Sequence, residues 1–281
     1  MRHLRFFSLT LALCAGAVLH GASQTLTVLQ WNTFHGGRGT DDRVDPSRQV
    51  NWMAAKNPDV ITLNEVTAPQ ADDYRQRLET ATGETWYAYH VVSQTDGIGN
   101  EILSRHQLLT TSSYRMKTNG EYRRGVTEAT IDAGGTFVNV FATHLDNANS
   151  AVRAAQVQEL LAFMQGFSGP AILAGDLNAA PESAELQPLF ADVADTWMDA
   201  LATGRAVAYP DNPPGPDTRT RGSRIDYVLH TSGLTTVQAE IPDQRDWSQT
   251  GVVEQVGTTD DLAVRPSDHN FVFAVLSVSD R

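Results

Sequence analysis

Residues 171–178 read Ala171-Ile172-Leu173-Ala174-Gly175-Asp176-Leu177-Asn178, a short apolar run that ends in an aspartate and an asparagine. Short apolar runs bounded by turn-forming residues are typical of buried strands. The stretch therefore predicts a strand over 171–174, with Asp176 and Asn178 just beyond its end. Loops at the ends of rigid strands are where binding and catalytic groups collect. We therefore expect a functional site at this edge of a sheet.

The same arrangement recurs along the chain. Side chains that can bind a metal or transfer a proton follow or open other predicted strands at Asn32, Glu65, His144, Asp146, Asp226, Asp268 and His269. A single polar residue after a strand is most often part of a turn, where its side chain bonds the backbone. Because the pattern repeats on many strands, we favour one site that these residues share.

Strand patterns alternate with helical patterns after residue 24. Helices are expected at 46–56, 70–82 and 150–167, and strands at 25–31, 60–63, 86–92, 102–104, 126–131, 137–143, 171–174, 224–230, 234–239 and 271–278. Strand-rich sequence with interleaved helices and hairpins indicates mixed sheets covered by helices. We find no repeat and no second domain boundary, so residues 24–281 are expected to form one domain.

The first 23 residues have the composition of a secretory signal peptide. Arg2 and Arg5 precede an apolar run at 6–19, and small residues follow at 21–23. We therefore expect a secreted or periplasmic protein that begins near Gln24. The apolar run is too short for a transmembrane helix, and no membrane span is expected in the mature chain. The one cysteine, Cys14, lies in this segment.

Composition limits the function classes. The chain has 281 residues, of which 41% are hydrophobic and 19% charged, and its formal net charge is −12. These values exclude a disordered chain and a polytopic membrane protein. An acidic surface does not attract polyanions at long range, so a phosphate-bearing substrate requires a local cation such as a bound metal. Asp, Glu and Asn oxygens suit Mg²⁺ or Mn²⁺, and we find no zinc-like ligand spacing.

A series of motifs, taken in order, resembles the endonuclease/exonuclease/phosphatase superfamily, which has the deoxyribonuclease I-like fold. The motifs are Gln30-Trp31-Asn32, Asp59 to Val66, Gly99 to Arg105, Thr143-His144-Leu145, Gly175 to Asn178, Arg224 to Tyr227 and Ser267-Asp268-His269. The resemblance runs from Thr25 to Leu276. It implies an α/β (α+β) fold, a four-layer α/β/β/α sandwich of two mixed, mainly antiparallel sheets flanked by helices.

The resemblance also implies roles at a metal site. Glu65 resembles the principal ligand of Mg²⁺ or Mn²⁺, with Asn32 beside it and Asp268 as a second carboxylate. Asp176 resembles the group that orients or deprotonates the attacking water. Asn178 resembles a partner that positions this water and the phosphate.

Further roles concern the phosphate and the leaving group. His269 resembles a catalytic histidine held by Asp226, and His144 resembles a donor to a phosphoryl oxygen or the leaving group. Arg124 resembles the arginine that contacts phosphate, although Arg123 fits equally well. A histidine beside a carboxylate favours the imidazolium, which stabilises negative charge or transfers a proton.

The resemblance implies a divalent-metal-dependent phosphoesterase, most simply a phosphodiesterase or endonuclease that uses an activated water for in-line attack. Alternatives are a phospholipid phosphodiesterase of the sphingomyelinase type and a phosphomonoesterase of the inositol-phosphate type. A non-catalytic binding protein on the same scaffold is a further alternative. The near absence of lysine weighs against duplex DNA. The expected partner is therefore a phosphate ester, bound by a monomer.

Some positions depart from the family pattern or carry no motif. Asn64 replaces a frequent glutamine, and Glu101 stands where a small residue is common, so it either faces outward or modifies the site. We expect His35 to be a surface or structural residue. The Pro- and Gly-rich loops at 209–222 and 242–266 have a length typical of functional or disordered segments. Trp247, an aromatic residue on the second loop, is suited to contact substrate or a membrane surface.

Overall fold

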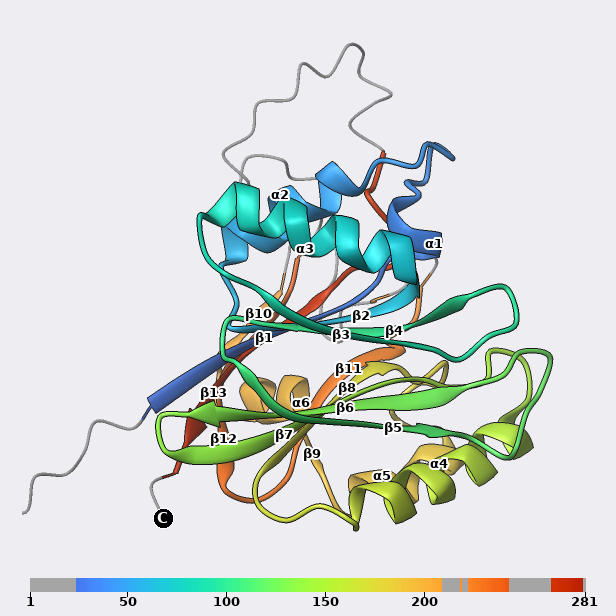
Figure 1. The fold of residues 1–281 in the computed structure, drawn as a ribbon. Helices are drawn as coiled ribbons and strands as arrows, with labels where there is room; N and C mark the ends of the chain where they lie inside the picture. Colours follow the sequence, from blue (N-terminus) through green and yellow to red (C-terminus); the bar gives the residue numbers. More distant parts are fainter. Residues whose placement is uncertain (1–23, 209–217, 219–221, 243–263, 280–281) are drawn as a thin grey trace, which may run out of the picture.

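The computed structural model describes residues 24–208, 218, 222–242 and 264–279. Within them two β-sheets pack face to face, and helices cover both outer surfaces (Figure 1). The predicted four-layer sandwich is therefore confirmed. The predicted leader at 1–23, most of both long loops and Trp247 lie outside the described residues.

The first sheet has seven strands and the second has six. Their order is β10 (Ala206–Ala208), β12 (Leu234–Ile241), β13 (Val272–Val278), β1 (Gln24–Asn32), β2 (Val60–Thr67), β4 (Ile98–Ser104) and β3 (Tyr87–Val92) in the first sheet. In the second it is β5 (Leu108–Arg115), β6 (Gly125–Ala133), β7 (Thr136–His144), β8 (Ala171–Asp176), β11 (Asp226–His230) and β9 (Ala194–Asp195). The pairs β1–β2, β7–β8 and β10–β12 are parallel and the others antiparallel, as expected for mixed sheets.

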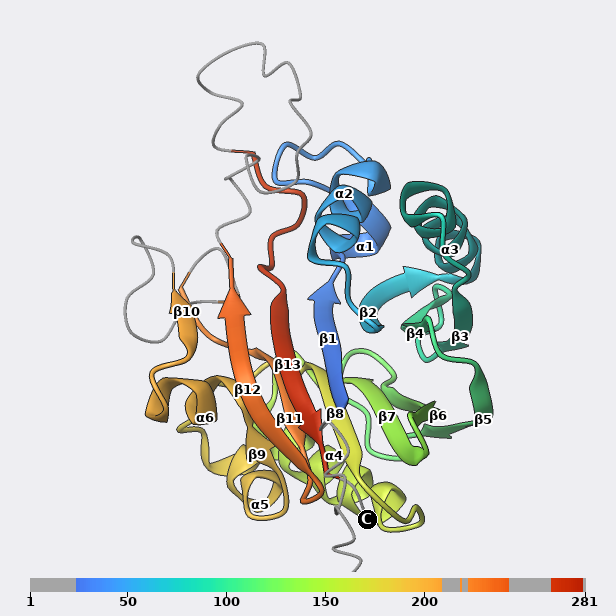
Figure 2. The same ribbon diagram turned by 90° about the vertical axis from the view of Figure 1, so that its left-hand side faces the viewer.

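Helices α2 (Pro46–Lys56) and α3 (Ala68–Thr82) lie over the first sheet, and α4 (Ser150–Met164) and α5 (Gln187–Phe190) lie over the second (Figures 1 and 2). The remaining short elements are α1 (Phe34–Gly37), a 3₁₀ turn at Ala184–Leu186, and α6 (Thr196–Ala202). Asp45 caps α2 by accepting a hydrogen bond from the Ser47 N–H, and Pro46 is the first helical residue. No helix in the described ranges is long and apolar enough to cross a membrane.

Side chains alternate between two apolar layers along each central strand. In β1, Leu26 and Val28 belong to the core between the sheets, whereas Leu29 and Trp31 pack under α2 and α3. In β8, Ala174 lies between the sheets. Since side chains two positions apart share a face of a strand, residues 32 and 176 continue the inter-sheet face at the strand ends.

Several parts of the fold differ from expectation, and the short elements α1, α5, β9 and β10 were not predicted. β5 was not predicted, because Leu108–Arg115 is a largely exposed edge strand whose serine and threonine residues mask the alternation. α6 was also missed, since its seven residues give too short a periodic pattern. β2 extends beyond the predicted 60–63 to Thr67 through an irregularity between Asn64 and Val66.

Candidate active site

A pocket of about 230 Å³ opens at one end of the two sheets. Of the predicted site residues, those that line it are Glu65, Arg124, His144, Asp176, Asn178, Asp268 and His269. The other two, Asn32 and Asp226, are buried directly behind it, with 1% and 0% of their surface exposed. The fold therefore brings all nine predicted residues to one place.

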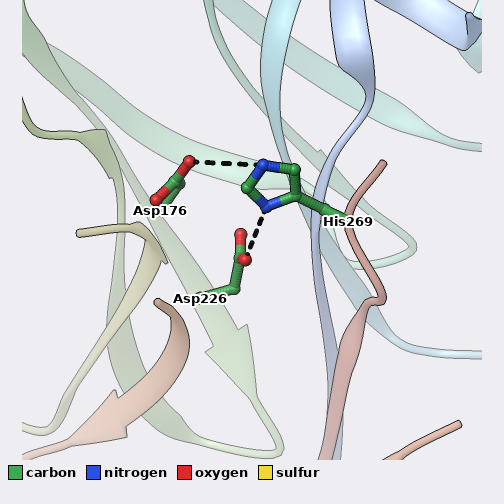
Figure 3. Close-up of side chains that lie close together, drawn as sticks. All are labelled: Asp176, Asp226 and His269. Carbon is green, nitrogen blue, oxygen red and sulfur yellow. Dashed lines mark hydrogen bonds and ion pairs between the residues drawn. The ribbon is translucent and has the colours of Figure 1, made fainter. Parts of the chain in front are cut away.

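His269 lies between two carboxylates (Figure 3). Its Nδ1 lies 2.7 Å from Oδ2 of Asp226, and its Nε2 lies 3.9 Å from Oδ2 of Asp176. Burial lowers the pKa of His269, but the charge and hydrogen bond of Asp226 outweigh burial and raise this pKa to about 10. His269 is therefore an imidazolium at neutral pH.

The Asp176 carboxylate is surrounded by several other residues of the site. Its Oδ2 accepts a hydrogen bond from Asn32 Nδ2 at 3.0 Å, and its Oδ1 accepts one from the Asn178 backbone N–H at 2.9 Å. Burial, together with the nearby Asp226 charge, raises the pKa of Asp176 against the opposing effect of His269. A carboxylate whose pKa is raised toward neutrality is suited to accept a proton from water.

His144 differs from His269 in its charge. Its Nε2 lies 3.5 Å from Oδ2 of Asp176. Burial lowers the pKa of His144 well below its ordinary value, and the positive charges of Arg124 and His269 lower it further. His144 is therefore neutral at pH 7, where its imidazole can donate one hydrogen bond without adding charge.

Glu65 is turned into the pocket by the irregularity in β2. Its φ is 62°, in the left-handed region, at the point where the pairing of β2 with β4 shifts register. Its Oε1 accepts a hydrogen bond from Asn32 Nδ2 at 3.1 Å, and its Oε2 accepts one from the His35 backbone N–H at 3.1 Å. Each oxygen has a further lone pair with which a hard cation can be bound.

His35 is exposed, as expected, and its side chain also lines the pocket. Its Nε2 lies 3.8 Å from Glu65 Oε2. Phe34 and His35 both have left-handed φ values, 50° and 56°, which are unfavourable for residues other than glycine. The Phe34 N–H donates to Asn32 Oδ1, and Gln70 Nε2 donates to the His35 carbonyl, so local bonds hold this turn.

Hydrogen bonds to β1 and α2 hold the segment that carries Asp268 and His269. The Ser267 hydroxyl donates to the Asn32 carbonyl at 2.7 Å, and Trp31 Nε1 donates to the His269 carbonyl at 2.9 Å. Gln49 of α2, fully buried, donates through Nε2 to the carbonyls of Thr33 and Pro266. Sequence reasoning missed Gln49, although an amide on the apolar face of α2 is the kind of signal that marks such a contact.

Burial distinguishes Arg124 from Arg123 as the arginine that faces the pocket. Arg124 is 2% exposed, whereas Arg123 is exposed to solvent. Within the described residues, its buried Nε and Nη1 atoms have no hydrogen-bond partner. Burial lowers the pKa of Arg124, and the surrounding carboxylates oppose this effect. A buried guanidinium that is short of acceptors beside a pocket is suited to bind an anion.

Some residues of the pocket belong to no motif noted in the sequence and were not predicted. Phe34, Ile98, Tyr122 and Asn147 also line the pocket, and Arg124 lies over the Tyr122 ring at 5.6 Å from its centroid. They come from separate parts of the chain, with Phe34 in α1, Ile98 at the start of β4, and Tyr122 and Asn147 in connections, so only the folded chain brings them together.

Glu101 does not face the pocket. It is fully buried on the side of β4 that packs under α3, and within the described residues neither carboxylate oxygen has a hydrogen-bond partner. The expectation of an outward-facing residue was therefore wrong, because the alternation that directs Asn100 toward the inter-sheet layer directs Glu101 toward the helices. Burial raises the pKa of Glu101 well above its ordinary value.

We expect Glu101→Gln to make the protein less sensitive to alkaline pH. Because the folded-state pKa of Glu101 is raised, the folded protein binds more protons than the unfolded chain above about pH 4.5. The wild-type free energy of unfolding should therefore fall as pH rises, by up to about 1.4 kcal/mol per unit. Urea denaturation between pH 4 and 9 should show a flatter profile for the variant. Parallel profiles would contradict the assignment.

Comparisons with known proteins agree with this fold. Residues 29–269 match the model of the Endonuclease/Exonuclease/phosphatase family. A solved family protein from Beutenbergia cavernae is 25% identical, with a TM-score of 0.66 over 91% of this chain and 72% of that one. One from Bacteroides vulgatus is 18% identical, with a TM-score of 0.69 over 91% of this chain and 99% of that one.

A curated protein of Drosophila melanogaster, named "Putative neutral sphingomyelinase", is 29% identical over 150 residues. The match covers 46% of this chain and 34% of that protein, so the chain spans about a third of that relative's length. The family match covers most of the described chain, and the matched range includes Glu65 and His269. The chain therefore belongs to the endonuclease/exonuclease/phosphatase family, whose members are metal-dependent phosphoesterases.

Proposed function

We propose that this protein is a metal-dependent phosphodiesterase that cleaves its substrate by in-line attack of water. The observation that carries the proposal is the buried Arg124, whose Nε and Nη1 atoms have no acceptor among the described residues. It lines the same pocket as Asp176 and His269. A phosphate placed there would meet a cationic fork, a proton acceptor and an imidazolium together.

The donor set suits a hard divalent cation. Glu65 and Asp268 present carboxylates to the pocket, and we propose that they hold Mg²⁺ or Mn²⁺. Asn32 donates through Nδ2 to both Glu65 and Asp176, which supports a role in orienting these carboxylates. The cation, when bound, neutralises charge on the phosphoryl oxygens. The ligand atoms of Asp176, Asp226 and His269 also lie within 4.8 Å of one another, but the Asp226–His269 hydrogen bond favours acid–base work.

The protein side chains supply the remaining chemistry. Asp176 accepts a proton from the attacking water, whose oxygen forms the new bond to phosphorus as the leaving-group oxygen departs. Asn178, held by its Nδ2 bond to the Leu145 carbonyl at 3.1 Å, helps to orient this water. Arg124 and the His269 imidazolium stabilise the charge on the phosphoryl oxygens, and neutral His144 donates a hydrogen bond to them.

The charge of the pocket favours a diester over a monoester. Among the described residues that line the pocket, Arg124 is the one arginine or lysine, and four residues are carboxylates, Glu65, Asp96, Asp176 and Asp268. A phosphomonoester carries about two negative charges at neutral pH, whereas a diester carries one. Because four carboxylates face only the Arg124 guanidinium and the His269 imidazolium, the described side chains of the pocket favour the singly charged ester.

A phospholipid is the second candidate for the diester, beside nucleic acid. The sequence match to the Drosophila melanogaster protein supports it, and the net charge of −12 disfavours long polyanions. We further propose that the protein is exported, on the composition of residues 1–23. N-terminal sequencing of protein secreted by its host should then begin near Gln24.

The test compares bis(p-nitrophenyl) phosphate with p-nitrophenyl phosphate in Mg²⁺, Mn²⁺ or EDTA. We expect faster cleavage of the diester and loss of activity in EDTA. Arg124→Ala should raise KM by about tenfold or more, and Arg124→Lys should recover only part of this loss, because lysine lacks the planar fork. Preference for the monoester would support a phosphatase, and binding without cleavage would support a non-catalytic protein. DNA, RNA and sphingomyelin vesicles would then separate the diester classes.

A further inference from the structure

Three buried side-chain amides form a ladder across the strands of the first sheet, directly behind the pocket. Gln30 Nε2 donates to Asn64 Oδ1 at 2.7 Å, and Asn64 Nδ2 donates to Asn100 Oδ1 at 2.8 Å. The three side chains lie on β1, β2 and β4 and are at most 2% exposed. We call this set the amide ladder.

The amide ladder also bonds to the second sheet. Asn64 Oδ1 accepts a hydrogen bond from the Asp176 backbone N–H at 3.0 Å, and Asn64 Nδ2 donates to the Thr143 carbonyl at 3.0 Å. Asn100 Nδ2 donates to the Gly125 carbonyl at 3.0 Å. The two sheets, which pack largely through apolar side chains, are thus joined at this end by directional bonds, beside those from Asn32 to Asp176 and from Thr127 to Asn100.

The bonded backbone groups all belong to, or adjoin, residues that act in the pocket. Asp176 is bonded through its own N–H, Thr143 precedes His144, and Gly125 follows Arg124. Asn64 itself precedes Glu65. Apolar contacts are not directional and tolerate small sliding of one sheet over the other, whereas a fully bonded buried amide has one favourable position.

We infer that the amide ladder is a positioning device that sets the register of the two sheets at the active site. It holds Glu65 of the first sheet against Asp176, His144 and Arg124 of the second. The roles of these groups rest on the proposed function, but the bonds of the ladder do not. Asn64 controls the group that accepts the proton, and Asn100 controls the arginine that binds the anion.

The test uses two ladder variants and a matched control. Asn64→Ala should lower kcat by about 10²-fold, because a shift of about 1 Å at a reacting group costs this much. Asn100→Ala should mainly raise KM, by about tenfold, because Arg124 loses its anchor. Asn139→Ala is the control: Asn139 is also a buried amide in a strand, and it donates to the carbonyls of Ser168 and Pro170 away from the pocket. It should lower the melting temperature similarly and leave kcat and KM within about twofold.

Two further measurements keep the inference testable if a variant does not fold or the enzyme has another substrate. Thr143→Val removes a second donor to the Gly125 carbonyl, at 3.1 Å, and should raise KM in the same direction by a smaller factor. Calorimetric binding of inorganic phosphate in Mg²⁺ should weaken by about tenfold in Asn100→Ala and stay unchanged in Asn139→Ala. If the ladder variants and the control change stability alike and leave kcat, KM and phosphate affinity unchanged, the inference is wrong. If the wild type does not hydrolyse phosphate esters but phosphate binding is still weakened in Asn100→Ala and not in Asn139→Ala, only the proposed function is overturned.

Discussion

Asp176→Asn is expected to lower kcat by about 10⁴-fold, the scale of loss on removal of a catalytic group. The amide cannot accept the proton of the attacking water. It also changes the bonds at Oδ2, which lies near Asn32, His144 and His269. The measurement is steady-state hydrolysis of bis(p-nitrophenyl) phosphate in saturating Mg²⁺.

Stability separates this loss from unfolding. Burial and the Asp226 charge raise the pKa of Asp176, so the ionised carboxylate is unfavourable in the folded protein at neutral pH. Asp176→Asn should therefore keep or raise the melting temperature at pH 8. A kcat within about tenfold of wild type would contradict the role of Asp176 as proton acceptor. A loss this small is expected for a group that only positions others and does not contact the reacting atoms.

Asp226→Asn is expected to lower kcat by about 10²- to 10⁴-fold and to change its pH dependence. The carboxylate at 2.7 Å from His269 Nδ1 outweighs burial and raises the pKa of His269 to about 10. Without it, only the smaller effects of the Asp176 and Asp268 charges oppose burial, so the pKa of His269 falls and the imidazolium is lost at a lower pH. The alkaline limb of the kcat profile should therefore move to lower pH.

The measurement is the kcat profile from pH 5 to 10.5, together with NMR titration of the His269 ring. Asp199→Asn is a matched control, because Asp199 Oδ2 lies 3.2 Å from Nε2 of another buried histidine, His230, outside the pocket. It should leave kcat and its pH profile unchanged. An unchanged alkaline limb in Asp226→Asn would show that the charge of His269 is not required.

Much of the site could be predicted from the order of residues in the chain. Asp176 and Asn178 follow an apolar run so closely that a strand end was the simplest interpretation, and the structure places both at the pocket. These predictions succeeded because they depend on local pattern, which a strand or helix expresses within a few residues.

Other features could not be predicted because they depend on contacts between distant segments. The contact of His35 with Glu65 joins residues that are 30 positions apart. Gln49 acts on Pro266, 217 positions away. Sequence could not choose between Arg123 and Arg124, since both precede the same strand. Only the packing of that strand decides which guanidinium is buried.

The sequence by itself determined the layers of this protein and the faces of its strands. A two-residue period places Leu26, Val28 and Ala174 between the sheets, and it directs the polar residues at positions 32, 64, 100 and 176 toward the same layer. Tertiary structure alone decided how these positions meet, because apolar faces specify burial without specifying alignment. Asn64 bonds the backbone of Asp176 across 112 residues, and directional bonds of this kind align the two sheets at the site.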